Sequence, residues 1–283
     1  MDATIRVTLA QTDVALGDTA DNLRSAGAVL EQARAERSDL VVFPELSLSG
    51  YSLGGVDADV SMPAAGAELA PYLRPEDQMG VVVGFPEAGP VHTYNSAAYV
   101  EYGTQRHVHR KLYLPTYGGF EERKHFSPGQ SLRAFDTRVG RIAMLICNDM
   151  WQPMLPFLAV QDGARMLVVP ANSSCHQFSG ITDIRAEWRM INRFHARMLA
   201  CWVVFVNRVG REGHLEFWGG SHVVDPWGEI VYEASGDVAE TVTLDLDVNA
   251  VRRRRREIPL VKEARLGLLM REIERLAAEG GDL

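Results

Sequence analysis

The sequence has few cysteines and none of the spacings that bind zinc or build a disulfide framework. Its 283 residues hold three, Cys147, Cys175 and Cys201, with no Cys-x-x-Cys pair. An odd count without framework spacing argues against the disulfide-rich secreted class and favours reduced thiols in a reducing compartment. Because no Cys/His ligand pattern occurs either, we expect no metal site.

Long apolar runs and an excess of positive charge are also missing. No apolar run approaches the 18 residues of a membrane-spanning helix, and residues 1–4 lack the pattern of a signal peptide. The formal net charge of −8 argues against nucleic acid or an anionic membrane as a partner. The exception is Arg252–Arg256, five consecutive arginines, which we interpret as a salt-bridged helical face or an arm that packs on a partner subunit. We therefore expect a cytoplasmic protein with no membrane or nucleic-acid partner.

Short apolar runs alternate with amphipathic stretches along the chain. The pattern predicts helices over 19–37, 154–162 and 183–200, and strands over 4–11, 39–43, 79–84, 142–146, 165–170, 202–206 and 241–246, with a hairpin over 95–110. Strands that alternate with helices indicate an α/β fold with mixed sheets. We expect one domain over about residues 1–250, followed by a charged, helix-rich arm over 251–283 that belongs to the same domain or to a dimer interface.

Three of the predicted strands end on a chemically reactive side chain. Glu45 follows the strand 39–43, Lys111 ends the hairpin, and Cys147 follows the strand 142–146. Chemistry in open α/β sheets collects at the carboxyl ends of strands. A thiol attacks as its thiolate, a carboxylate can take its proton, and an ammonium can stabilise the oxyanion that forms. The backbone N–H of Asn148 would be a second oxyanion donor.

Each of these residues also has an ordinary structural interpretation. Free cysteine is often simply buried, a carboxylate after a strand often caps a helix or joins a salt bridge, and a lone lysine is usually solvated. Spacing does not show that the three meet in space. The irregular, glycine-rich and charged stretch 116–129 favours function, because long loops inside compact domains often form binding sites.

Three stretches, in their order and with their gaps, resemble the motifs of the nitrilase superfamily, the carbon–nitrogen hydrolases. The stretch Phe43–Tyr51 resembles the glutamate motif, His109–Pro115 the lysine motif and Leu145–Asp149 the cysteine motif. Shorter matches extend the likeness from about residue 4 to about residue 265, and they lie at 94–97, 207–210, 219–221 and 225–228. The resemblance implies a four-layer αββα sandwich that pairs as αββα–αββα in a homodimer or a higher homo-oligomer.

The resemblance also implies roles for individual residues. Glu45 would be the general base and acid, Lys111 the oxyanion stabiliser and Cys147 the nucleophile. Many members add a second glutamate in the loop after the lysine, and Glu121 and Glu122 are both candidates. Glu122 matches the pattern better, since an aromatic residue follows it four positions later.

The implied reaction passes through a thioester on Cys147, releases ammonia or an amine, and needs no cofactor. Six residues are candidates for contacting the substrate, a small amide: Tyr51, Tyr117, Glu121, Asn148, Trp151 and Asn172.

The substrate's identity stays open at the level of sequence. The stretch Leu114–Phe126 and the segment Asn172–Ser174 are similar to the glutaminase domains of glutamine-dependent NAD synthetases, so a glutaminase-like subunit that supplies ammonia to a separate synthetase is an alternative. Hydrolysis of N-carbamoyl amino acids or amines is another. Nitrile hydrolysis ranks lower, because Asn148–Asp149 stands where nitrilases usually carry Trp-Glu. A non-catalytic scaffold ranks lowest, since it has no need of all three reactive residues.

Overall fold

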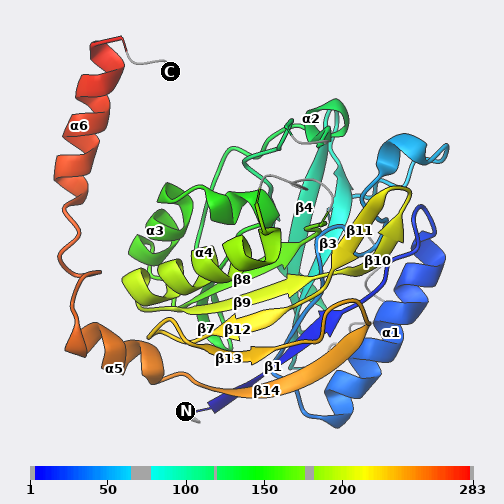
Figure 1. Cartoon of the computed structure of the whole chain (residues 1–283), viewed down its shortest axis with the longest axis horizontal. Coiled ribbons are helices and arrows are strands. Elements are labelled where there is room, and N and C mark those ends of the chain that lie inside the picture. Colours follow the sequence, from blue (N-terminus) through cyan, green and yellow to red (C-terminus); the bar gives the residue numbers. More distant parts are fainter. Residues whose placement is uncertain (1–3, 65–77, 118–119, 176–181, 281–283) are drawn as a thin grey trace.

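The computed structural model describes residues 4–64, 78–117, 120–175 and 182–280. Its helices and strands alternate along the chain, as the sequence pattern predicts (Figure 1). In order they are β1 (Thr4–Gln11), α1 (Thr19–Ala35), β2 (Leu40–Val42), η1 (Leu53–Gly55), β3 (Gly80–Ala88), β4 (Thr93–Glu101), β5 (Thr104–Arg110), α2 (Glu122–His125), β6 (Phe135–Thr137), β7 (Gly140–Met144), η3 (Cys147–Trp151), α3 (Met154–Gln161), β8 (Met166–Ala171), α4 (Ile184–Leu199), β9 (Trp202–Asn207), β10 (Val209–Glu212), β11 (Leu215–Trp218), β12 (His222–Val224), β13 (Ile230–Glu233), β14 (Glu240–Asp247), α5 (Ala250–Glu257) and α6 (Leu266–Ala278).

Two six-stranded mixed sheets form the centre of the molecule. The first has the order β14-β1-β2-β3-β4-β5 and the second the order β13-β12-β9-β8-β7-β6. Parallel pairs join β1 to β2, β2 to β3, β7 to β8 and β8 to β9, whereas hairpins and β14 supply the antiparallel edges. The carboxyl ends of β2 and β7 therefore carry Glu45 and Cys147, each a few residues beyond its strand.

Helices cover the outer faces of the two sheets. Helix α1 packs on the first sheet through Ala26, Leu30 and Ala33, and α3 and α4 lie on the outer side of the second sheet (Figure 1). The largest core cluster joins apolar side chains of both sheets, including Leu9 and Val203. The fold is the predicted αββα sandwich, in which burial of both sheet faces explains the continuous apolar runs of the strands.

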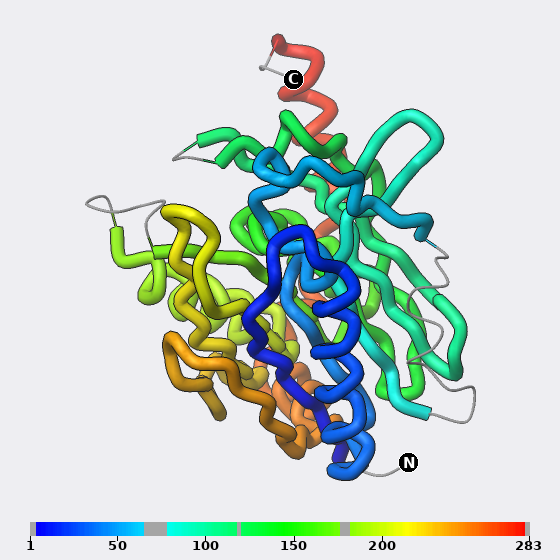
Figure 2. The backbone as a smooth tube through the Cα atoms, turned by 90° about the vertical axis from the view of Figure 1, so that its right-hand side faces the viewer, coloured from blue at the N-terminus to red at the C-terminus, as the bar shows by residue number. Residues whose placement is uncertain are grey.

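The C-terminal residues form two helices of different character. Helix α5 contains the arginine run and packs on the body through Ala250, Val251 and Arg254. The side chain of Arg255 donates to two backbone carbonyls, and that of Arg253 pairs with Asp247, so the run contacts its own chain. Helix α6 has no buried residue and extends away from the body in both views (Figures 1 and 2).

Two details differ from the sequence prediction. The strand before Cys147 ends at Met144, because the chain turns there into the short helix η3, although the N–H of Leu145 still donates to Val168. The hairpin of β10 and β11 was not predicted, since its strands are short and polar residues interrupt the apolar pattern. No helix in the described ranges is both long enough and apolar enough to cross a membrane.

Candidate active site

Glu45 lies just beyond β2, on a turn that packs against the backbone of β3. A side chain at Gly84 would place its Cβ 2.4 Å from the nitrogen of Leu46 and 2.6 Å from the oxygen of Pro44, so only glycine fits there. The Glu45 carboxylate is 1% exposed. Its Oε1 accepts from Asn95 at 2.7 Å, and its Oε2 accepts from the backbone N–H of Asn172 at 2.8 Å. These bonds fix both oxygens of a buried carboxylate.

Lys111 lies between two carboxylates. Its Nζ donates to Glu45 Oε1 and to Glu122 Oε1, both at 2.7 Å, and the side chain is fully buried. Burial lowers the pKa of Lys111, but Glu122 and Glu45 raise it to well above its usual value, so the side chain is an ammonium. An ammonium has three N–H donors, and no third partner occurs among the described residues. One donor is therefore left for a ligand.

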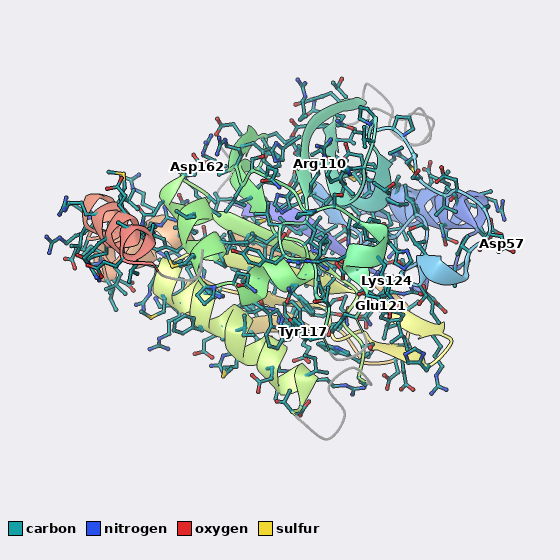
Figure 3. All side chains as sticks on the ribbon, turned by 90° about the horizontal axis from the view of Figure 1, so that it is seen from above. Asp57, Arg110, Tyr117, Glu121, Lys124 and Asp162 are labelled. Atoms are coloured by element: carbon teal, nitrogen blue, oxygen red, sulfur yellow. The ribbon has the colours of Figure 1, made fainter. Side chains whose placement is uncertain are left out.

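Glu122, at the start of α2, joins the buried cluster, whereas its neighbour does not. The Oε1 of Glu122 also accepts from the hydroxyl of Tyr51 at 2.8 Å. Burial raises the pKa of Glu122 to about 7, Lys111 opposes that rise, and Glu45 adds to it. Glu121 instead points to solvent, where its carboxylate pairs with Lys124, and both side chains lie on the surface (Figure 3). The structure thus brings Glu122, and not Glu121, to Glu45 and Lys111.

Cys147 begins η3 with a left-handed backbone. Its φ is +47°, a conformation that costs a residue with a Cβ roughly 1–2 kcal/mol. Such strain is often found where a side chain must be aimed at a reacting centre. The thiol is within electrostatic reach of Glu45, Lys111 and Glu122.

The surroundings of the Cys147 thiol favour its neutral form. Burial raises the pKa of the thiol well above its usual value, and the carboxylate of Glu45 raises it further. Lys111 and the backbone of Asn172 lower it without reversing the shift. A thiol in this state needs a base to become a nucleophile.

A buried carboxylate connects the turn at Cys147 to the strand end at Lys111. The Oδ2 of Asp149 accepts from the backbone N–H of Ile146 at 3.1 Å and contacts His109 Nε2 at 2.9 Å. Its Oδ1 accepts from the backbone N–H groups of Leu112 and Tyr113, at 2.9 and 3.0 Å. Asp149 therefore sets the distance between the two segments that carry the thiol and the ammonium.

A small cavity of about 20 Å³ lies beside Cys147, which is room for about one water. Tyr117, Asn148 and Trp151, three of the predicted substrate contacts, line it. The remaining lining residues are Pro115, Phe120, Ser173, Ile184 and Trp188. Aromatic side chains thus form much of its wall.

The predicted substrate contacts differ in their hydrogen bonding. The carboxamide of Asn148 is engaged on both sides, since it donates to the carbonyl of Tyr113 at 3.1 Å and accepts from the hydroxyl of Tyr117 at 2.9 Å. Asn172 is 1% exposed, and neither polar atom of its side chain has a partner in the described part of the chain. Tyr51 contacts Glu122 and lines a second cavity rather than the one beside Cys147.

Sequence reasoning missed two supporting residues. Asn95 lies 50 positions from Glu45, and Asp149 lies 40 positions from His109, so no local pattern links the partners. Both fall inside stretches that match the family's motifs, which is the one signal that could have identified them. In the described ranges, no three His, Cys, Asp or Glu side chains gather closely enough to hold a metal ion.

Comparisons with known proteins agree with this geometry. The family model for carbon-nitrogen hydrolase matches residues 6–256. An (R)-stereoselective amidase of Pseudomonas sp is 34% identical over 89% of this chain and 88% of its own length. A glutamine-dependent NAD(+) synthetase of Thermotoga maritima is 33% identical over 87% of this chain, which spans 42% of that relative.

Solved structures give the same result. The crystal structure of the carbon-nitrogen hydrolase from Helicobacter pylori G27 superposes with a TM-score of 0.84 at 25% identity, covering 94% of this chain and 96% of that one. The family match spans most of the chain, and the fold is the same over nearly its whole length. The chain therefore belongs to the carbon–nitrogen hydrolase family of enzymes, within the nitrilase superfamily.

Proposed function

We propose that the chain hydrolyses the C–N bond of a small amide through a thioester on Cys147, releasing ammonia or an amine. The observation that supports this most strongly is the buried ammonium of Lys111, held by Glu45 and Glu122 within electrostatic reach of the thiol. An ion pair with a purely structural role would not need the third N–H of Lys111 to stay unused near a cysteine with a strained backbone. The (R)-stereoselective amidase relative supports an amide as substrate.

In the acylation step, Glu45 takes the proton of the Cys147 thiol as the sulfur attacks the carbonyl carbon. The negative charge that develops on the oxygen is stabilised by the free N–H of Lys111 and by the backbone N–H of Asn148. As the C–N bond breaks, Glu45 returns the proton to the leaving nitrogen. A thioester remains on Cys147, and ammonia or an amine is released.

In the deacylation step, Glu45 removes a proton from a water that attacks the thioester carbon. The C–S bond then breaks, the acid leaves, and the thiolate recovers the proton from Glu45. Glu122 keeps Lys111 charged throughout, because a second carboxylate offsets the cost of burying the ammonium. Tyr117 and Trp151, which line the cavity beside Cys147, are proposed to contact the substrate. Asn172 is proposed as a polar anchor, since its carboxamide has no partner among the described residues.

A panel of small amides, N-carbamoyl amino acids, nitriles and glutamine tests the proposal, with ammonia or amine release as the signal. Wild-type protein is expected to turn over the amides, and Cys147→Ala to lose at least about a thousandfold of that rate while keeping its fold. Cys201→Ala is the matched control, because Cys201 is buried far along the chain from the cluster. A Cys147→Ala protein with wild-type turnover would sink the proposal.

A second candidate is a glutaminase-like subunit that passes ammonia to a separate synthetase. The 33% identity to the Thermotoga maritima NAD(+) synthetase favours it. It predicts that glutamine is the best substrate of the panel. If glutamine is not hydrolysed and no synthetase copurifies, this candidate is rejected and the amide proposal stands.

A further inference from the structure

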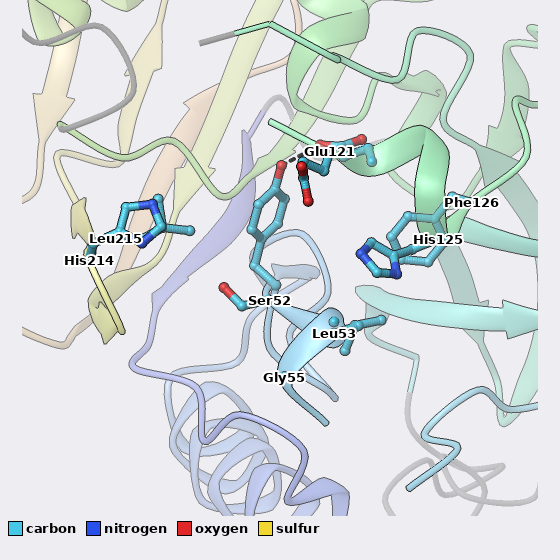
Figure 4. Close-up of a pocket in the computed structure, with 11 residues that line it drawn as sticks. Ser52, Leu53, Gly55, Glu121, His125, Phe126, His214 and Leu215 are labelled. Atoms are coloured by element: carbon cyan, nitrogen blue, oxygen red, sulfur yellow. Dashed lines mark hydrogen bonds between the residues drawn. The ribbon is translucent and has the colours of Figure 1, made fainter. Parts of the chain in front are cut away.

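A second cavity lies behind the buried cluster, on the side of Glu122 and Tyr51. It has a volume of about 200 Å³, ten times that of the cavity beside Cys147, and the two share no lining residue. Gly55 lies on one side, His125 of the α2 segment on a second, and His214 of the β10–β11 turn on a third (Figure 4). Tyr51 and Glu122 also line the cavity. We call it the Glu122 pocket.

Glu122, which lines the pocket, carries an unsatisfied acceptor. Glu122 is 4% exposed, and its Oε1 already accepts from Lys111 and from Tyr51. Its Oε2 is buried without a hydrogen-bond partner in the described part of the chain. A buried carboxylate oxygen left unpaired is costly, so such an atom calls for a donor. The cavity that Glu122 lines is where that donor can bind.

The rest of the lining favours a cation. The imidazoles of His125 and His214 can accept hydrogen bonds, and the carboxylate of Glu121 adds negative charge that Lys124 partly neutralises. Burial raises the pKa of Glu122 to about 7, and a bound cation would shift that carboxyl towards its ionised form. A primary ammonium offers three N–H donors and fits 200 Å³ without filling it.

One wall of the pocket is held in place by hydrogen bonds to Glu212. The carboxylate of Glu212 accepts from the backbone N–H groups of Tyr51 at 3.0 Å and of Ser52 at 2.8 Å, and it also pairs with the buried Arg208. The loop that carries one wall is therefore held to β10. A binding site that is already formed loses less entropy when its ligand arrives.

We propose that the Glu122 pocket binds ammonium or a small primary ammonium ion, and that it receives the amine released at Cys147. The second half rests on the proposed function; the first does not. Lys111 donates both to Glu122, which lines the pocket, and to Glu45, which in the proposed mechanism gives the proton to the leaving nitrogen. The amine that C–N hydrolysis produces is a cation at neutral pH. Of the two cavities described, the Glu122 pocket is the larger and is the one lined by carboxylates.

Direct binding is measured on the Cys147→Ala chain, so that turnover plays no part. Calorimetric titration with methylammonium chloride is compared with sodium chloride at equal ionic strength. Gly55 lines the pocket, and a phenylalanine there would add a bulky side chain at a position where a Cβ meets no atom within 4 Å. Gly55→Phe is expected to weaken binding at least about tenfold, whereas Gly267→Phe, on the exposed α6, leaves it unchanged.

A charge variant gives an independent readout. His214→Lys puts a cation on the pocket wall and is expected to weaken methylammonium binding about tenfold, while His92→Lys, on the exposed β3–β4 turn, does not. Absence of saturable binding to the Cys147→Ala chain overturns the proposal. Equal affinity in Gly55→Phe and Gly267→Phe overturns it as well, because the cation then binds elsewhere.

The link to the reaction is tested by product inhibition of the wild-type enzyme. Methylammonium is expected to inhibit amide hydrolysis in a way that excess substrate does not reverse, because its pocket is separate from the cavity beside Cys147. A purely competitive pattern would place the amine in the substrate site and refute the link. Loss of all hydrolysis would refute the proposed function and leave the binding result intact.

Discussion

At the scale of the residue, the cluster places one ammonium between two buried carboxylates. Lys111 needs a negative charge nearby to remain an ammonium without water, and Glu45 supplies one. If Glu45 alone balanced the charge of Lys111, it would be a poor acceptor for the proton of the thiol. Glu122 shares that task, which leaves Glu45 available to the thiol. In the proposed mechanism the two carboxylates therefore serve different purposes, although both accept hydrogen bonds from the same nitrogen.

The first prediction concerns Glu122 and pH. Its ionised form accepts hydrogen bonds from Lys111 and Tyr51, and burial raises its pKa to about 7. Lowering the pH through that value protonates Glu122 and weakens both bonds, so kcat/KM is expected to rise with pH through about 7. In Glu122→Gln this acid limb is expected to disappear and kcat/KM to fall about a hundredfold.

Glu121→Gln provides the matched control, because Glu121 is the adjacent, exposed carboxylate. We expect its pH profile and its kcat/KM to stay within about twofold of wild type, as for other exposed charges. The measurement is kcat/KM between pH 5 and 9 for the three proteins. The same acid limb in Glu122→Gln would mean that another group governs it.

Sequence reasoning named the three reactive residues, but not the surroundings that set their state. Glu45 and Cys147 each follow an apolar strand and Lys111 ends the hairpin, and the family motifs mark all three. The neutral thiol of Cys147 and the raised pKa of Glu122 arise from burial by segments distant in the chain. The choice between Glu121 and Glu122 likewise depended on which one faces inward, which the one-turn helix α2 decides.

At the scale of the element, Asp149 is the connection between two strand ends. Its carboxylate accepts hydrogen bonds from the backbone N–H of the residue before Cys147 and from those of the two residues after Lys111. No strand pairing joins the two segments, because β5, which precedes Lys111, and β7, which precedes Cys147, belong to different sheets. The relative position of the ammonium and the thiol therefore depends on this carboxylate.

The second prediction is that Asp149→Asn reduces both stability and rate. An amide has one acceptor oxygen and cannot accept all three backbone N–H groups together with His109. We expect the free energy of unfolding to drop by about 2–4 kcal/mol and kcat by at least about tenfold. Denaturant unfolding and steady-state kinetics measure the two effects.

Asp136→Asn is the comparison for that variant, because the side chain of Asp136 is 82% exposed and, within the described ranges, pairs with Arg141 alone. Its effect on unfolding is expected to stay within about 0.5 kcal/mol. If Asp149→Asn unfolds at the wild-type denaturant concentration and keeps its kcat, Asp149 does not connect the two segments as described.

The order of helices and strands was largely predictable, because it follows from patterns within short stretches of sequence. Continuous apolar runs predict buried strands such as β3 and β8, and the 3.6-residue period predicts α1 and α4. The hairpin β10–β11 was not predicted, since its strands of four residues contain charged and glycine positions. Its place in the fold depends on contacts that no short window of sequence contains.

At the scale of the whole molecule, two apolar surfaces have no cover among the residues that the structure describes. One lies on α4, where Met190 and Phe194 are 58% and 55% exposed. The other lies along α6, where Met270 and Ile273 are 59% and 57% exposed. Large exposed apolar patches on folded proteins mark contact surfaces. The pairing of αββα units that the family resemblance implies would place a second copy there.

The third prediction is accordingly a dimer that the α4 surface holds together. Light scattering is expected to give twice the 31.4 kDa of the chain. The double variant Met190→Glu, Phe194→Glu is expected to be monomeric, because it places two charges in the contact. Val91→Glu, at an 84% exposed position on the β3–β4 turn, should remain dimeric. A monomeric wild-type protein refutes the dimer.

The central claim is a covalent thioester on Cys147, and intact-protein mass spectrometry after a rapid acid quench tests it most directly. The protein is mixed with each member of the panel of amides, N-carbamoyl amino acids, nitriles and glutamine. The account predicts a mass increase equal to the acyl group of one substrate class, located on Cys147 and absent from Cys147→Ala. Release of ammonia without any adduct on Cys147, and with turnover retained in Cys147→Ala, would contradict it.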